Sequence, residues 1–361
     1  MTSITSLPSR LGILIFTTLL WLLAGAAHAG QAAIVVDASS GRVLGQVNAD
    51  ERNYPASLTK MMTLYLTFRE LKAGRLTLED RLPVSAWAAN RAPSKLGLRP
   101  GETISVEDCI LAMVTKSAND AATVAAESIG GNEKGFADMM NAQAALLGMS
   151  GTHFDNASGL PDPQNWSTAR DLLTLGRALF QDFPQFAHYF SVKEFEFNGQ
   201  LVRGHNHLMD RYPGMDGLKT GFTDASGFNL ASTAVRDGHR LFAVVLGGRT
   251  AAKRDQLMAS LLDAGFEQSE AVAALAAAGQ PPTGVAHRVL AALSPIANAE
   301  ADPAPASASR HATRRSKTAA RGCHARRGYT CRVKSHGSHA HGTIKLANRA
   351  ARRTAARSGE D

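Results

Sequence analysis

Strand-forming segments lie at both ends of the first 265 residues, and helix-forming segments lie between them. Residues 32–37 and 42–45 are strand-forming segments on either side of a Ser-Ser-Gly turn, which predicts a hairpin. Residues 228–235 and 240–246 flank an Asp-Gly turn and predict a second hairpin. Apolar residues recur at helical spacing at 57–73, 105–129, 133–147, 167–180 and 252–265. We therefore expect a mixed α/β fold in which one antiparallel sheet, built from both ends, is flanked by helices and carries a helical lobe.

Residues 1–29 have the pattern of a secretory signal peptide. Arg10 precedes an apolar run at 11–25, and the Ala-His-Ala sequence at 27–29 supplies small residues at a cleavage position. The apolar run is about 15 residues long, short for a bilayer core that needs roughly 20. An uncleaved N-terminal anchor is the alternative. Because both interpretations imply export, we expect the protein in the periplasm or elsewhere in the cell envelope.

Composition divides the rest of the chain into three parts. We expect a folded domain at 30–265, an Ala-rich linker at 266–300 and a basic low-complexity tail at 301–361. The tail has too few large apolar residues to offset its chain entropy, which predicts disorder. Residues 310–361 hold 14 Lys or Arg and two acidic residues, whereas residues 1–309 carry a net charge of −4. The net charge of +8 therefore belongs to the tail and indicates no nucleic-acid partner for the domain.

The tail and the cysteines indicate little chemistry. Electrostatic contact of the tail with anionic membrane or wall polymers is one interpretation, and a solvated extension without a dedicated function is the other. Cys109 lies in an apolar helical segment and is expected to be a buried thiol, while Cys323 and Cys331 could close a small loop in the tail. The histidines of the tail lack zinc-site spacing, so we expect no metal and no cofactor.

The first motif with chemical meaning is Ser57-Leu58-Thr59-Lys60 at the start of an apolar helix. Residues three apart share one face of a helix, so the amine of Lys60 would lie beside the hydroxyl of Ser57. A serine hydroxyl becomes a good nucleophile when a base removes its proton, and burial lowers the pKa of a lysine toward that role. A serine helix cap followed by a surface lysine is the alternative for this motif taken alone.

Two further motifs follow within the expected folded domain at 30–265. Ser117-Ala118-Asn119 offers a hydroxyl that relays a proton and an amide that holds a carbonyl, although a turn or a helix cap would also explain it. Lys219-Thr220-Gly221 stands just before the strand at 228–235. Its cation and hydroxyl suit a carboxylate, and Gly221 lets a substrate backbone approach closely.

The order and spacing of these motifs resemble the serine penicillin-recognising enzymes, in which they line one cleft between an antiparallel sheet and a helical lobe. The flanking sequences are similar to those of the low-molecular-weight D-alanyl-D-alanine carboxypeptidases, peptidase group S11. The similar flanks are at 54–63, 116–122, 152–160 and 214–223. The resemblance covers about residues 30–265 and implies a β-lactamase/DD-peptidase-like transpeptidase fold for that domain.

The resemblance also implies a reaction. Ser57 would attack the carbonyl between the two terminal D-alanines of a peptidoglycan stem peptide, expel D-alanine and form an acyl-enzyme. Lys60 would be the general base, and Ser117 would help to carry the proton to the leaving amine. β-Lactam antibiotics would acylate Ser57 as substrate mimics.

The resemblance assigns substrate contacts as well. Lys219 and Thr220 would hold the terminal carboxylate, and Asn119 the acyl side of the substrate. Arg254 matches an arginine that helps to bind the carboxylate in the family. The oxyanion hole would use the backbone N–H groups of Ser57 and Phe222.

Three alternative functions stay open. A DD-endopeptidase that cleaves peptidoglycan crosslinks is poorly separated from a carboxypeptidase by sequence. A class A β-lactamase would need a glutamate to activate water, but residues 150–167 contain only Asp155 and Asp162 as acids. A non-catalytic wall-binding protein is disfavoured because all three motifs are intact. Family members often carry a second β-rich domain and an amphipathic anchor helix, and residues 266–361 show neither pattern.

Overall fold

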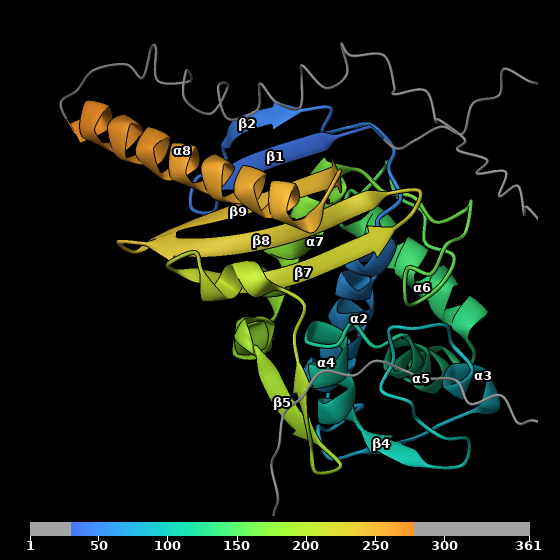
Figure 1. Cartoon of the computed structure of the whole chain (residues 1–361). Helices are drawn as coiled ribbons and strands as arrows, with labels where there is room; N and C mark the ends of the chain where they lie inside the picture. Colours follow the sequence, from blue (N-terminus) through green and yellow to red (C-terminus); the bar gives the residue numbers. More distant parts are fainter. Residues whose placement is uncertain (1–29, 278–361) are drawn as a thin grey trace, which may run out of the picture. The chain divides into compact units, whose positions relative to one another are not determined.

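The computed structural model describes residues 30–277, so the predicted signal peptide, most of the predicted linker and the predicted tail lie outside the described residues. The same holds for Cys323 and Cys331. Each neighbouring pair of strands in the central sheet is antiparallel, in the order β2-β1-β9-β8-β7 (Figure 1). These strands are β1 (Ala32–Asp37), β2 (Val43–Val47), β7 (Met215–Thr223), β8 (Gly227–Arg236) and β9 (His239–Gly248). Both predicted hairpins are confirmed, and pairing between β1 and β9 joins them into one sheet.

The two faces of the sheet contact different helices because side chains alternate along each strand. In β1, Ala33 and Val35 pack into a cluster with α8 (Ala251–Ala277). Ile34 and Val36 face the opposite way, into the main core with α2 (Lys60–Lys72) and α7 (Ala169–Asp182). Figure 1 shows α8 across one face of the sheet, with α2 and α7 on the other side. The predicted sheet flanked by helices is confirmed.

Helix α2 is buried almost all round, as its apolar sequence predicted. Its first turn is preceded by the short 3-10 helix η1 (Ala56–Thr59), so the predicted helix at 57–73 is two elements. The fully buried side chains of α2 include Lys60, Met61, Met62, Leu64, Leu66 and Phe68. Burying a lysine costs free energy unless its amine makes hydrogen bonds. Lys60 is therefore a candidate functional residue.

The helical lobe contains the short strands β3 (Arg81–Pro83) and β4 (Thr103–Ser105) and the helices α3 (Ala86–Ala89), α4 (Val106–Val114), α5 (Asn119–Gly130) and α6 (Glu133–Leu146). The helical pattern predicted at 105–129 corresponds to two helices, α4 and α5. The chain leaves α4 because Ser117 has a φ of +59° and Ala118 is extended, and α5 then begins at Asn119. Cys109, on α4, is fully buried, as predicted.

Helix α7 begins as predicted, with the Thr168 hydroxyl accepting a hydrogen bond from the Asp171 N–H. Helix α8 differs from the prediction, because it continues from 265 to Ala277 through the expected start of the linker. Gly265 does not end the helix but allows it to approach the sheet. A Cβ at this position would lie 2.8 Å from Leu241 and 3.2 Å from Val35. The alanines that follow favour continued helix.

The segment between α7 and β7 was not predicted in detail. It contains the 3-10 helix η2 (Pro184–Ser191), the hairpin strands β5 (Glu194–Phe197) and β6 (Gln200–Arg203), and the 3-10 helix η3 (His207–Asp210). Within residues 30–277, no helix combines the length and the hydropathy that a membrane crossing requires.

Candidate active site

Ser57 lies in η1, directly before α2, in a turn that the surrounding chain fixes. The buried Asn229 on β8 donates from Nδ2 to the carbonyl oxygens of Tyr54 (3.0 Å) and Pro55 (3.2 Å). Ala56 has a φ of +52°, a left-handed conformation that a residue with a Cβ adopts at some cost. The turn holds Ser57 at the surface of a cleft.

The amine of Lys60 makes three polar contacts in a fully buried position. Its Nζ lies 3.1 Å from Ser57 Oγ, 2.7 Å from Asn119 Oδ1 and 2.6 Å from the backbone oxygen of Ser158. The last two partners are carbonyl oxygens and only accept hydrogen bonds. A neutral amine has two N–H donors and one lone pair, so these two carbonyls direct the lone pair toward the Ser57 hydroxyl.

The surroundings of Lys60 favour this neutral form. Burial is the main cause that holds the pKa of Lys60 well below its usual range, and the positive charge of Lys219 lowers it further. The carboxylate of Asp120 acts in the opposite direction and raises the pKa of Lys60. The structure therefore supplies a base next to the candidate nucleophile.

Ser117 and Asn119 lie at the break between α4 and α5. Ser117 has its positive φ at this break, and within residues 30–277 its buried hydroxyl has no hydrogen-bond partner. Asn119 donates from Nδ2 to the backbone oxygen of Ala92 at 2.8 Å, which fixes Oδ1 toward Lys60. An unpartnered hydroxyl that lines the same cleft as Ser57 is suited to relay a proton.

The third motif lies on β7, which pairs with β8 at the edge of the central sheet. Gly221 is required by close approach, because a Cβ there would lie 3.0 Å from the Pro55 oxygen and 3.2 Å from the Ser57 nitrogen. Lys219 is buried and donates from Nζ to the backbone oxygen of Thr220 at 2.9 Å. Burial, assisted by the charge of Arg254, lowers the pKa of Lys219 to about 7.

Arg254 projects from the first turns of α8 to the same cleft. It donates to the backbone oxygen of Asn229 at 2.7 Å and to Asp255 Oδ1 at 2.8 Å. Burial lowers the pKa of Arg254, although Asp255 opposes this effect. The charges of Lys219 and Arg254 are thus close enough to affect each other, and an incoming carboxylate would relieve their repulsion.

The cleft has a volume of about 590 Å³. Six of the eight predicted site residues line it, together with Phe222: Ser57, Ser117, Asn119, Thr220, Gly221 and Arg254. The other two, Lys60 and Lys219, are buried just behind its surface. The structure therefore brings the three motifs together. The two lysines lie behind the cleft surface, so they act on a substrate through the groups that line the cleft in front of them.

Several residues at the site were not identified from the sequence. The backbone oxygen of Ser158 has no signature in the sequence, and Asp120 resembles an ordinary acid in a first helical turn. Asp120 is fully buried and accepts hydrogen bonds from the N–H groups of Leu96 (3.0 Å), Gly97 (2.8 Å) and Leu98 (3.1 Å). His205 also lines the cleft, and partial burial together with nearby lysines lowers its pKa to about 4.

Within the described range, no group of three or more His, Cys, Asp or Glu side chains is placed to hold a metal ion. Burial and neighbouring acids raise the pKa of the Cys109 thiol, which leaves it an unreactive core residue. The nucleophile and base that the structure places at the cleft are Ser57 and Lys60.

Comparisons with known proteins agree with this geometry. The family model described as D-alanyl-D-alanine carboxypeptidase (peptidase S11) matches residues 23–250. DacA and DacC of Escherichia coli are 37% and 39% identical over 246 residues, which is 66% of this chain. The alignments cover 61% and 62% of those relatives, so the chain spans about three-fifths of their length.

Solved structures show the same fold. Penicillin-binding protein 5 from Haemophilus influenzae has a TM-score of 0.64 at 34% identity, covering 68% of this chain and 73% of that one. Penicillin-binding protein D2 from Listeria monocytogenes, in an ampicillin-bound form, has a TM-score of 0.58 at 34% identity and covers 67% and 99%. The family match spans more than half of the residues and includes all three motifs. The chain belongs to the peptidase S11 family of D-alanyl-D-alanine carboxypeptidases.

Proposed function

We propose that this protein is a serine-type D-Ala-D-Ala carboxypeptidase that removes the terminal D-alanine from peptidoglycan stem peptides. The observation that carries the proposal is the environment of Lys60, whose two carbonyl partners leave the amine lone pair facing Ser57 Oγ at 3.1 Å. A buried amine in this position removes the hydroxyl proton without needing a histidine.

The reaction begins when Ser57 Oγ attacks the carbonyl carbon of the penultimate D-alanine and passes its proton to Lys60 Nζ. The C–N bond then breaks, and the leaving D-alanine nitrogen takes a proton through the Ser117 hydroxyl from the Lys60 ammonium. In the second half, Lys60 takes a proton from water, and the resulting hydroxide attacks the ester carbon. The bond between the ester carbon and Ser57 Oγ then breaks and releases the shortened peptide, and the proton passes from Lys60 to Ser57 Oγ, which restores the free enzyme.

The substrate's terminal carboxylate is expected to lie against Thr220 and Arg254. Lys219, buried behind the cleft surface, would add a positive charge that attracts it. This position is supported by the repulsion between the charges of Lys219 and Arg254, which an anion relieves. Asn119 is expected to hold the acyl side while it orients Lys60. The close packing of Gly221 on Ser57 supports an oxyanion hole made of the N–H groups of Ser57 and Phe222.

The same geometry supports covalent capture of β-lactams by Ser57, since the Listeria relative has been solved with ampicillin bound. We place the protein outside the cytoplasm, in the periplasm or cell envelope, where peptidoglycan is found. The basic residues at 310–361 suit contact with anionic membrane or wall polymers. This contact and export itself are proposals from the sequence.

The test is release of free D-alanine from a soluble peptide that ends in D-Ala-D-Ala, using the full chain. Ser57→Ala should abolish release and penicillin labelling, while Ser191→Ala, a change to an exposed serine, should alter neither. Release that persists in Ser57→Ala would refute the mechanism. Penicillin labelling without D-alanine release would instead indicate an endopeptidase acting on crosslinked substrates.

A further inference from the structure

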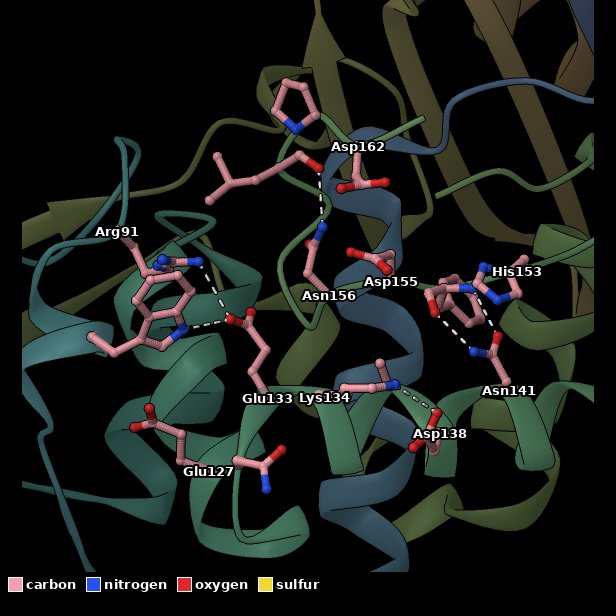
Figure 2. Close-up of a pocket in the computed structure, with 16 residues that line it drawn as sticks. Arg91, Glu127, Glu133, Lys134, Asp138, Asn141, His153, Asp155, Asn156 and Asp162 are labelled. Atoms are coloured by element: carbon pink, nitrogen blue, oxygen red, sulfur yellow. Dashed lines mark hydrogen bonds and ion pairs between the residues drawn. The ribbon is translucent and has the colours of Figure 1, made fainter. Parts of the chain in front are cut away.

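A second hollow lies beside the catalytic cleft, between α3, α6 and the segment 153–162, and we call it the outer pocket. Its volume is about 750 Å³, within the range of small-ligand sites. Leu160 and Pro161 line both hollows, so one segment of chain separates them. Figure 2 shows Glu133, Lys134 and Asp138 projecting from α6, and Asp155 and Asp162 facing them from this segment. A polymeric substrate in the cleft could therefore reach the outer pocket.

One wall of the outer pocket is an aromatic ring held in a fixed orientation. Trp87, on α3, is 56% exposed although it is a large apolar side chain. Its indole N–H donates to Glu133 Oε2 at 2.8 Å, and the guanidinium of Arg91 covers one ring face at 3.6 Å from the centroid. Arg91 also donates to the same oxygen of Glu133 at 3.3 Å. The exposure of Trp87 consequently falls on its other face.

The remaining walls present hydrogen-bonding groups. Five acidic side chains and two basic ones line the outer pocket, and two of the acids are paired with the bases as Arg91–Glu133 and Lys134–Asp138. Among the described residues, Asp155 forms no ion pair, and burial and the nearby Asp162 raise its pKa. Carboxylates of this kind are strong acceptors for ligand hydroxyl groups.

An exposed rigid aromatic face beside carboxylate acceptors matches the chemistry of a sugar. A pyranose ring has a face of C–H groups that packs on the negative face of an indole, and its hydroxyl groups project from the rim. A purely apolar ligand would leave the carboxylates unsatisfied, and a simple anion would be repelled by the excess of acids.

We propose that the outer pocket binds a sugar of the glycan strand that carries the stem peptides, with Trp87 as its platform. This proposal rests on the carboxypeptidase function, because it treats the outer pocket as a second contact for the same polymeric substrate. It adds recognition of the glycan to recognition of the peptide, so glycan-linked stem peptides bind better than free ones.

The first experiment titrates a tetramer of N-acetylglucosamine into the full chain by calorimetry. Trp87→Ala should weaken binding by about tenfold or more, as truncation of a central aromatic anchor does. Leu201→Ala is the matched control, since Leu201 is similarly exposed (59%) but lies on the β5–β6 hairpin. Asp155→Asn, at an exposed position, should weaken binding severalfold and provides a second test if Trp87→Ala fails to fold. No binding by the parent, or equal binding by all variants, would overturn the proposal.

The second experiment separates this proposal from the proposed function. With a short soluble peptide, Trp87→Ala should release D-alanine at the parent rate. With a glycan-linked stem peptide, the same variant should show a raised KM and an unchanged kcat. Failure of D-alanine release from the soluble peptide in the parent would refute the carboxypeptidase function, whatever the tetramer does. Equal KM values on the glycan-linked substrate would refute the glycan contact alone.

Discussion

Replacing Asp120 by asparagine tests how the cleft wall and the base are coupled. The buried carboxylate accepts from Leu96 and Ala121 on Oδ1 and from Gly97 and Leu98 on Oδ2. An asparagine has one acceptor oxygen, and its amide group would face two N–H donors. Two hydrogen bonds to a charged acceptor, each worth about 1.5–3 kcal/mol, are therefore lost. We expect the free energy of unfolding to fall by about 3–6 kcal/mol.

The same substitution should change the pH dependence of acylation. Asp120 raises the pKa of Lys60, so removing its charge lowers that pKa further. The base acts when neutral, and activity is lost as the pH falls through its pKa. The acidic limb of the penicillin acylation rate should therefore move to lower pH in Asp120→Asn.

Denaturant titration and acylation across pH measure the two effects. Asp120→Glu keeps the charge, so it should slow acylation without moving the acidic limb. Asp138→Asn removes an exposed acid whose partner, Lys134, lies 3.8 Å away, and should cost about 0.5 kcal/mol or less. An unmoved acidic limb in Asp120→Asn, or a limb moved to higher pH, would refute the coupling.

Three further perturbations follow from the geometry of the site. Gly159→Ala should abolish acylation and lower the melting temperature, because its φ is +79° and a Cβ would lie 1.8 Å from the Ala56 oxygen; normal acylation would contradict this packing. In the parent, kcat/KM should fall at low pH as Lys60 becomes charged, and should fall above about pH 7 as Lys219 loses its proton. A flat profile between pH 5 and 9 would count against both roles. Arg254→Ala should raise KM for D-Ala-D-Ala peptides and move the alkaline limb upward, because Arg254 lowers the pKa of Lys219; an alkaline limb that stays in place would exclude that interaction.

The sequence was sufficient to predict the elements whose patterns are local. Both hairpins, the buried helix after Ser57 and the start of α7 at Thr168 follow from apolar periodicity and caps. The three motifs were also recognised, because each is a short run of chain. The left-handed conformation of Ser117 between α4 and α5 was not predicted, since serine is not a residue type that indicates a positive φ.

Contacts made by backbone atoms could not be predicted in this way. The backbone oxygens of Ser158 and Ala92 orient Lys60 and Asn119, but any residue type supplies a carbonyl. The predicted end of the last helix at 265 was wrong for a related reason. A glycine in a helical pattern resembles a terminator, and only the packing of α8 on Leu241 shows that it allows close approach instead.

The strand order of the central sheet has a consequence for how the protein folds. Ala32 in β1 pairs with Leu246 in β9. The first strand of the domain can therefore form this pairing only when a strand about 200 residues later has been synthesised. Pairings between such distant segments slow folding, because the loop between them must be closed before any contact forms. The turn that carries Ser57 rests on β7 and β8, which belong to the same late hairpin region. The nucleophile therefore acquires its surroundings only after synthesis has passed β8, and a nascent chain shorter than that has no assembled catalytic site.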